Sequence, residues 1–101
     1  MKPLPLQQMI NLSEKVAIVT GGAMGIGYGI AYRLAEAGAS VVIADTNIQA
    51  AEESAQKLIA EGWKAASIEI DVSNSGHISR MMQFADEKFG ALDILVNNAG
   101  I

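Results

Sequence analysis

Short apolar stretches alternate along this chain with longer segments of helical periodicity. Four stretches are rich in β-branched residues, namely KVAIVT (15–20), SVVIAD (40–45), KAASIEID (64–71) and LDILVNN (92–98). The first has no polar alternation, which is typical of a strand buried on both faces of a parallel sheet. The pattern predicts four strands at these positions.

The segments between the strands repeat their apolar residues at the spacing of an α-helix. The three stripes are Ile26, Ile30, Leu34, Ala35 and Ala37; Ala51, Ala55, Leu58 and Ile59; and Ile78, Met81, Met82, Ala85 and Phe89. Each is followed by a glycine suited to a left-handed C-cap, Gly38, Gly62 and Gly90. The candidate N-caps are Thr46 or Asn47 for the second helix and Ser73 for the third.

Strictly alternating strands and helices predict right-handed crossovers and therefore an α/β fold with a parallel sheet. We expect the first half of a doubly wound, Rossmann-type sheet, βαβαβαβ, with strand order 3-2-1-4. Only AGI follows the fourth strand. The sheet is therefore expected to be incomplete and to leave an apolar edge strand unpaired.

Composition narrows the functional classes. The chain has 101 residues, of which 50% are hydrophobic and 18% charged, with a net charge of −4. No apolar run approaches the roughly 20 residues that span a bilayer, and scattered Lys and Arg form no basic stripe for nucleic acid. With no cysteine and a single histidine, His77, a zinc site is not expected. The opening residues lack the apolar core of a secretory signal, so we expect a cytoplasmic protein.

Glycines gather where the first strand passes into the first helix. A helix that begins directly after a buried strand presents free N–H groups and a positive dipole end to a phosphate, and glycine allows close approach. The spacing of Gly21, Gly25 and Gly27 is GxxxGxG and not the better-known GxGxxG. The segment is either a diphosphate-binding turn or an ordinary tight strand-to-helix turn.

Three motifs occur in an order that resembles the short-chain dehydrogenase/reductase family. TGGAMGIG (20–27) is similar to its TGxxxGxG motif, DV (71–72) to the pair after its third strand, and NNAG (97–100) to its fourth-strand motif. The resemblance runs from Leu12 onward and covers the first half of the family's fold. We therefore divide the chain into an N-terminal extension, flexible or docked (1–13), and an incomplete dinucleotide-binding domain (14–101).

The resemblance implies a role for each motif residue. The diphosphate and ribose would be surrounded by backbone of the first motif, from Gly21, Gly25, Ile26 and Gly27. Met24 would lie beside the adenosine. Asp71 and Val72 would hold the adenine, although Asp71 could instead be a turn residue ahead of Ser73. The residues beneath the adenosine ribose would be Asn98, Ala99 and Gly100. Thr20 and Asn97 are expected to join strands, and Gly29, outside the motif, to let its helix pack closely on the first strand.

Asp45 bears on the choice of cofactor. It ends the second predicted strand, 18 residues after Gly27, about where a dinucleotide site places an acid for the ribose hydroxyls. Against a 2′-phosphate at ~4 Å, with an effective dielectric constant of ~20, the repulsion would reach about 4 kcal/mol. Met24 and Thr46 stand where the family's NADP-preferring members commonly carry a basic residue. NAD is therefore expected over NADP, with Asp45 as a helix N-cap being the other interpretation.

The resemblance also implies an oxidoreductase that moves hydride between a nicotinamide and a small alcohol or ketone. The family's chemistry uses a Ser, a YxxxK pair and an Asn beyond NNAG, and this sequence contains none of them. Tyr28 and Tyr32 lie on the first predicted helix, with Arg33 but no Lys near them in the sequence. We expect no catalytic residue and no activity in these 101 residues alone, and a homo-oligomer, dimer or tetramer, for the full-length protein. The alternative is a non-catalytic nucleotide-binding fragment or a partner-dependent module.

Overall fold

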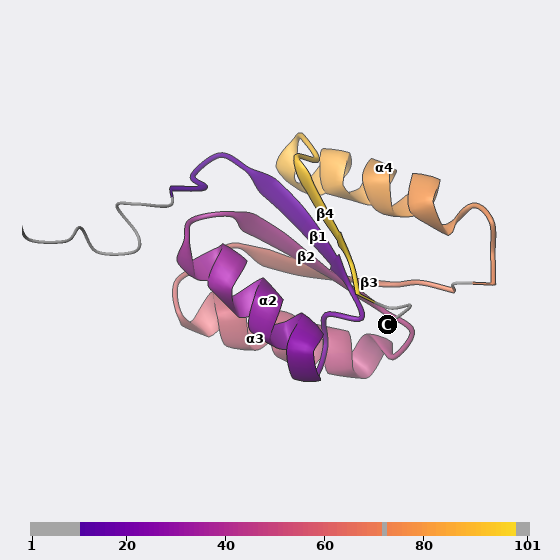
Figure 1. The fold of residues 1–101 in the computed structure, drawn as a ribbon, viewed down its shortest axis with the longest axis horizontal. Helices are drawn as coiled ribbons and strands as arrows, with labels where there is room; N and C mark the ends of the chain where they lie inside the picture. Colours follow the sequence, from indigo (N-terminus) through magenta and orange to yellow (C-terminus); the bar gives the residue numbers. More distant parts are fainter. Residues whose placement is uncertain (1–10, 72, 99–101) are drawn as a thin grey trace, which may run out of the picture.

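The four predicted strands form one parallel sheet. A computed structural model describes residues 11–71 and 73–98. The strands are β1 (Val16–Thr20), β2 (Ser40–Asp45), β3 (Ala65–Glu69) and β4 (Ile94–Asn97), and the helices between them are α2 (Gly25–Glu36), α3 (Ile48–Ala60) and α4 (His77–Phe89). The strand order is β3-β2-β1-β4 (Figure 1). The predicted α/β class and the order 3-2-1-4 are confirmed.

β1 is the centre of the sheet and pairs with β2 on one side and with β4 on the other, so that Val19 lies between Ile43 and Val96. All residues of β1 are buried, which agrees with a run of apolar residues without alternation. β3 and β4 are shorter than their predicted ranges. β3 leaves the ladder after Glu69, which is the partner of the last residue of β2, Asp45.

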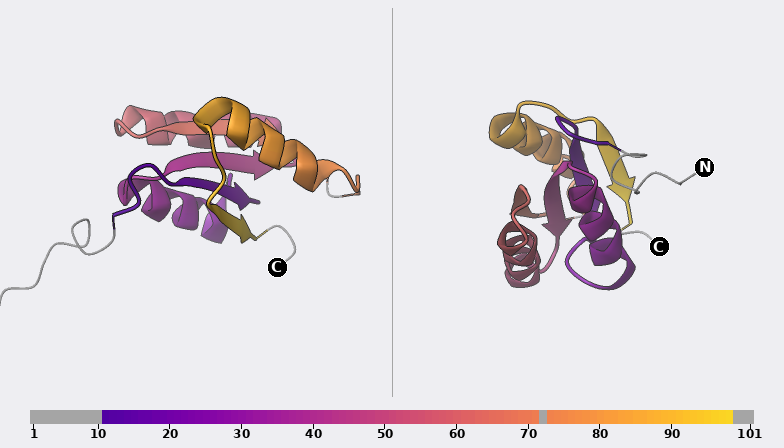
Figure 2. Two further views of the ribbon diagram at one scale, coloured as in Figure 1. Left: turned by 90° about the horizontal axis from the view of Figure 1, so that it is seen from above. Right: turned by 90° about the vertical axis from the view of Figure 1, so that its left-hand side faces the viewer.

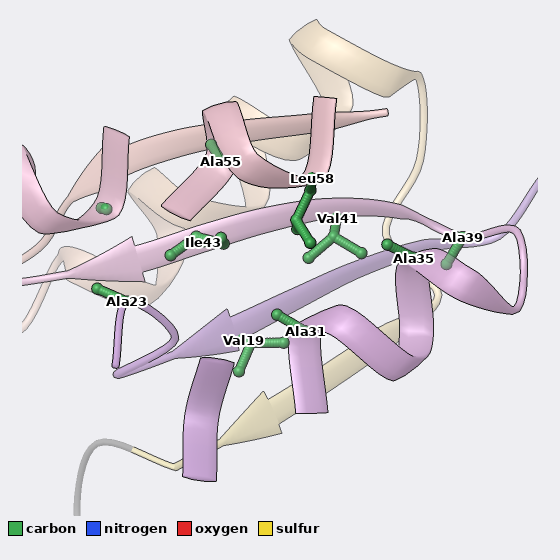
Figure 3. Close-up of a cluster of buried hydrophobic side chains, with 10 residues drawn as sticks. Val19, Ala23, Ala31, Ala35, Ala39, Val41, Ile43, Ala55 and Leu58 are labelled. Atoms are coloured by element: carbon green, nitrogen blue, oxygen red, sulfur yellow. The ribbon is translucent and has the colours of Figure 1, made fainter. Parts of the chain in front are cut away.

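The helices cover the sheet from both sides. α2 and α3 lie on one face and α4 on the other (Figures 1 and 2). On the first face, a buried cluster joins strand residues such as Val41 and Ile43 to Leu58 of α3 and to the small residues Ala31 and Ala35 of α2 (Figure 3). On the other face the cluster comprises Val16, Ile18, Val42, Ala44, Ile68, Ile70, Met81 and Ala85. Burial on both faces of β1 and β2 explains their apolar sequences.

The helix ends agree with the sequence except at one position. Gly38, Gly62 and Gly90 all have positive φ, as predicted for residues that end helices. Asn47 caps α3, since its side chain accepts a hydrogen bond from the N–H of Ala50.

The predicted N-cap of the third helix is wrong. α4 begins at His77 after Gly76, without a side-chain cap. Ser73 lies four positions before the helix, where its hydroxyl donates to Asp71. A serine ahead of a helical stripe can bond to a nearby carboxylate as readily as to a helix amide.

The ends of the described chain differ in how they meet the sheet. Leu12 packs against the cluster on the α2 and α3 face, and its N–H donates to the carbonyl of Ala37. Within residues 11–71 and 73–98, β4 pairs with β1 alone, and its Leu95 is 47% exposed. The expected apolar edge strand is therefore present. Among the described residues, no helix has the length and hydropathy that crossing a membrane requires.

Candidate functional site

The carboxyl ends of three strands meet the glycine-rich turn at one edge of the sheet. β1 ends at Thr20, β2 at Asp45 and β4 at Asn97, and the turn leads from β1 into α2. This edge brings together most of the predicted site residues: Gly21, Met24, Gly25, Ile26, Gly27, Asp45, Thr46 and Asn98. In open α/β sheets, ligands bind outside the carboxyl ends of the strands, where neighbouring connections diverge.

The turn requires glycine for two separate reasons. Gly21 and Gly25 have φ of +64° and +59°, a left-handed conformation that costs other residues free energy. Gly27 is buried and its φ is ordinary, but a Cβ there would overlap the carbonyl oxygen of Gly21 and lie 2.6 Å from Nδ2 of Asn98. The motif therefore combines a sharp turn with close contact between α2 and the end of β1.

Gly29 does not have the packing role predicted for it. It is exposed, and a Cβ at this position would meet nothing within 4 Å. About half a helical turn separates the two faces of an amphipathic helix, so Gly29, two residues after Gly27, lies on the solvent side. Close approach of α2 to the sheet comes from Gly27, Ala31 and Ala35, which are the buried residues of this helix.

Thr20 links the end of β1 to the end of β4. Its Oγ1 accepts a hydrogen bond of 2.9 Å from the N–H of Asn98 and donates toward Oδ1 of Asn97 at 3.1 Å. The side chain of Asn98 in turn donates to the carbonyl of Gly21 at 3.2 Å. The structural roles predicted for Thr20 and Asn97 are confirmed, and Asn98 is shown to brace the glycine-rich turn.

The carboxylate of Asp45 bridges β2 and the glycine-rich turn. Oδ2 accepts from the N–H of Ala23 at 3.2 Å, and Oδ1 accepts from the N–H of Asn47 at 3.0 Å. Asp45 is half-buried and is not the N-cap of α3, because that position belongs to Asn47. Thr46, beside it, is exposed. The acid is thus held in a defined orientation at the edge where the strands end.

Ser54 is a site residue that the sequence did not point to. It lies on α3, is 3% exposed, and donates a hydrogen bond of 2.6 Å to the carbonyl of Ala23 in the turn. A signal was available, because Ser54 stands on the apolar stripe of α3 among Ala51, Ala55 and Leu58. A hydroxyl on a core-facing stripe needs a hydrogen-bond partner.

The start of α2 is open to solvent. Its N-cap residue, Met24, is extended and makes no side-chain capping bond, in contrast to Asn47 at α3. Met24 and Ile26 are 66% and 77% exposed, and Gly25 between them is exposed as well. Free amides at an exposed helix N-terminus form an anion-binding position without any basic side chain.

Asp71 lies just after β3 in an exposed turn. Its Oδ1 accepts from both the hydroxyl and the N–H of Ser73, at 2.6 and 3.0 Å. These bonds, the hydroxyl first, lower the pKa of the Asp71 carboxyl because they favour its charged form. In the structure Asp71 is therefore a turn residue, which was the alternative interpretation of this position. Val72, Ala99 and Gly100, which were predicted to bind the cofactor, lie outside the described residues.

The tyrosines of α2 are packed as structural aromatic residues. Tyr32 contacts Trp63 edge-to-face, with ring centroids 5.0 Å apart, and Lys57 lies over the ring of Tyr28. Burial, with smaller contributions from Tyr32 and Glu61, raises the pKa of Tyr28. A tyrosine that exchanges protons with substrate near neutral pH needs the opposite shift. Within the described part of the chain, no group of acidic or histidine side chains could hold a metal ion.

Comparison with known proteins agrees with this geometry. The profile of the family described as short chain dehydrogenase matches residues 15–101. The chain belongs to the short-chain dehydrogenase family. Over the cofactor-binding region it is therefore homologous to NAD(P)-dependent oxidoreductases.

Several members of the short-chain dehydrogenase family are closely similar to this chain. It is 44% identical to galactitol 2-dehydrogenase of Agrobacterium fabrum, over 91% of this chain and 35% of that protein. It is also 44% identical to 3beta-hydroxysteroid dehydrogenase 2 of Eggerthella lenta, over 89% of this chain and 35% of that protein. The crystal structure of hydroxysteroid dehydrogenase from Escherichia coli superimposes with a TM-score of 0.83 and 40% identity, covering 87% of this chain and 37% of that one. The chain thus spans little more than a third of the length of these relatives.

Proposed function

We propose that this chain is the cofactor-binding part of an NAD-dependent oxidoreductase that acts on a small alcohol or ketone. The observation that carries the choice of NAD is the carboxylate of Asp45, held by the N–H of Ala23 at the edge of the glycine-rich turn. A fixed carboxylate accepts hydrogen bonds from the two hydroxyls of an adenosine ribose. It repels a 2′-phosphate, and the two positions where a basic residue could offset that repulsion are occupied by Met24 and Thr46.

The residues of the edge fit the other parts of a dinucleotide. The exposed amides at the start of α2 would receive the diphosphate, with backbone of Gly21, Gly25, Ile26 and Gly27 around it and Met24 beside the adenosine. Asp71 and Val72 would hold the adenine, and Asn98, Ala99 and Gly100 would lie beneath the ribose. Oδ1 of Asp71 already accepts from Ser73, so an adenine amine would bind through Oδ2.

A bound nicotinamide supplies the hydride acceptor or donor for the reaction. The residues described here bind and orient that cofactor, and we assign proton transfer and substrate contact to other residues of the natural protein. Two relatives are named galactitol 2-dehydrogenase and 3beta-hydroxysteroid dehydrogenase 2, which supports an alcohol or ketone as substrate. The family resemblance further supports a cytoplasmic homo-oligomer, a dimer or tetramer, which light scattering would measure.

Calorimetric titration of the natural protein with NAD and with NADP tests the proposal. We expect NAD to bind at least about tenfold more tightly, which corresponds to about 1.4 kcal/mol. Tighter binding of NADP would refute the argument from Asp45, and binding of neither nucleotide would refute the function.

The reading frame downstream of Ile101 separates an enzyme from a nucleotide-binding module. A serine and a YxxxK pair in that frame, together with NAD-dependent oxidation of an alcohol, are expected for the enzyme. A stop codon directly after Ile101, with NAD binding but no turnover, would favour the non-catalytic module.

A further inference from the structure

We propose that Ser54 of α3 positions the glycine-rich turn for the diphosphate of the cofactor, acting through the peptide groups of Ala23. This inference rests on the proposed function, because it concerns how the same turn receives NAD. Ser54 itself is a positioning residue and contacts no cofactor atom.

Ala23 is held from two sides by two different elements. Its N–H donates to Oδ2 of Asp45, at the end of β2, at 3.2 Å. Its carbonyl accepts from Oγ of Ser54, on α3, at 2.6 Å. Among the described residues, Thr20 and Ser54 are the polar side chains that are buried, at 3% exposure each. A short hydrogen bond in a buried environment is electrostatically stronger than the same bond in water.

The location of Ala23 makes this restraint important for binding. Ala23 lies between Gly21 and Gly25, the two left-handed residues of the turn. It is followed by Met24, which makes no side-chain capping bond to α2. Without a cap, the direction of the first amides of α2 depends on how Ala23, the residue before Met24, is held. Ser54 and Asp45 hold Ala23, so they set the orientation of the amides that receive the diphosphate.

Ser54 also couples the turn to the ribose-binding acid. Loss of its hydroxyl leaves the carbonyl of Ala23, a residue 5% exposed, without its side-chain donor. The turn must then move toward water to hydrate that carbonyl. Because the N–H of the same residue bonds to Asp45, such a movement also disturbs the carboxylate.

The test compares Ser54→Ala with Leu58→Val in the natural protein. Leu58 is a suitable control because it is fully buried on the same face of α3 and belongs to the core cluster. Three quantities are measured for each variant: the Kd for NAD, the melting temperature, and hydrogen–deuterium exchange of the peptide covering residues 20–28.

We expect Ser54→Ala to weaken NAD binding about tenfold, the equivalent of about 1.4 kcal/mol, and to speed exchange in the turn. Leu58→Val should lower the melting temperature while keeping the Kd within about twofold, because the loss of a core methylene lowers the stability of the fold without moving the turn. If Ser54→Ala does not fold, Ser54→Cys, which has the same branching with a larger atom and a weaker donor, takes its place.

An equal effect of both variants on the Kd at an equal loss of melting temperature would overturn the proposal, since Ser54 would then be an ordinary core residue. Unchanged NAD binding and unchanged exchange in Ser54→Ala would overturn it as well. Failure of the wild-type protein to bind NAD or NADP is a different result, because it refutes the proposed function and the positioning role with it.

Discussion

The hydroxyl of Thr20 accepts a hydrogen bond of 2.9 Å from the backbone of Asn98, a residue 78 positions later in the chain. The bond joins the ends of two neighbouring parallel strands at the edge where the glycine-rich turn begins. The side chain of Asn98 also donates to the carbonyl of Gly21, so this one residue connects the end of β4 both to β1 and to the turn. The edge of the sheet is therefore one hydrogen-bonded unit.

Thr20→Val tests this connection, because valine keeps the shape of threonine and removes the hydroxyl. We expect a loss of about 1–3 kcal/mol in the free energy of unfolding, since the N–H of Asn98 loses its buried acceptor. Thr20→Ser, which keeps the hydroxyl and loses a methyl group, should cost about 1 kcal/mol. Urea denaturation measures both, and a valine variant that is as stable as the wild-type protein would contradict the prediction.

Gly27→Ala and Gly29→Ala form a matched pair on one helix. At Gly27 the added methyl group would overlap the carbonyl of Gly21, so we expect a cost of about 1–3 kcal/mol and weaker NAD binding. At Gly29 the methyl group enters open space, and the higher helix propensity of alanine should stabilise the protein by up to about 1 kcal/mol. Thermal denaturation and NAD titration check both. Equal effects of the two substitutions would refute the packing role of Gly27.

Asp45→Asn and Asp45→Ala separate the charge of this side chain from its hydrogen bonds. Both remove the repulsion toward a 2′-phosphate, so the ratio of NADP to NAD affinity should rise about tenfold or more. Asparagine retains an acceptor for the N–H of Ala23 or Asn47 and alanine retains none. NAD affinity should therefore fall further in Asp45→Ala.

Asp93→Asn is the control for this pair. Asp93 also accepts a backbone N–H, that of Val16, but it lies at the amino end of the sheet. The cofactor ratio should be unchanged in this variant. An equal change in the Asp93 and Asp45 variants would show a general effect of charge and refute the assignment of Asp45 to the ribose.

Asp71 is expected to titrate below the ordinary aspartate pKa of 3.8, because Ser73 bonds to the charged carboxylate. A depressed native pKa means that the turn is stabilised above the pKa of the unfolded chain. That stabilisation is lost as the pH falls through the native pKa. Carboxyl ¹³C shifts measured against pH give the midpoint.

Ser73→Ala should raise this midpoint toward the ordinary value, since the side-chain hydrogen bond is the largest cause of the shift. The backbone N–H of residue 73 still donates in this variant, so part of the depression should remain. Identical midpoints in the two proteins would contradict the role of the hydroxyl.

The alternation of strands and helices could be predicted from the sequence because it depends on local periodicity. Buried strands such as 40–45 have no polar alternation, and the stripes of the helices repeat every three to four residues. Right-handed crossovers leave few arrangements of such a chain, which is why the order 3-2-1-4 could be predicted. The position of the glycine-rich turn followed as well, since it joins the first strand to the first helix.

The spacing of glycines did not reveal which of them is needed for packing. Gly29 was expected to face the first strand, whereas Gly27 has that place. A difference of two residues moves a position by about 200° around a helix. The exact rotation of α2 depends on its alanines meeting the sheet. Ser73 failed as an N-cap for a similar reason, because the start of α4 depends on how the loop before it closes.

The sequence by itself determined the elements and the motif that predicts a dinucleotide site, because each of these depends on residues close together in the chain. The order of the strands followed from the regular alternation of strands and helices. Only the tertiary structure decided how the turn is held. Asp45 and Ser54 lie 22 and 31 positions from Ala23. They meet the same residue because β2 lies beside β1 and α3 packs over β2. Such a meeting depends on distances between elements, which no local pattern of residues records.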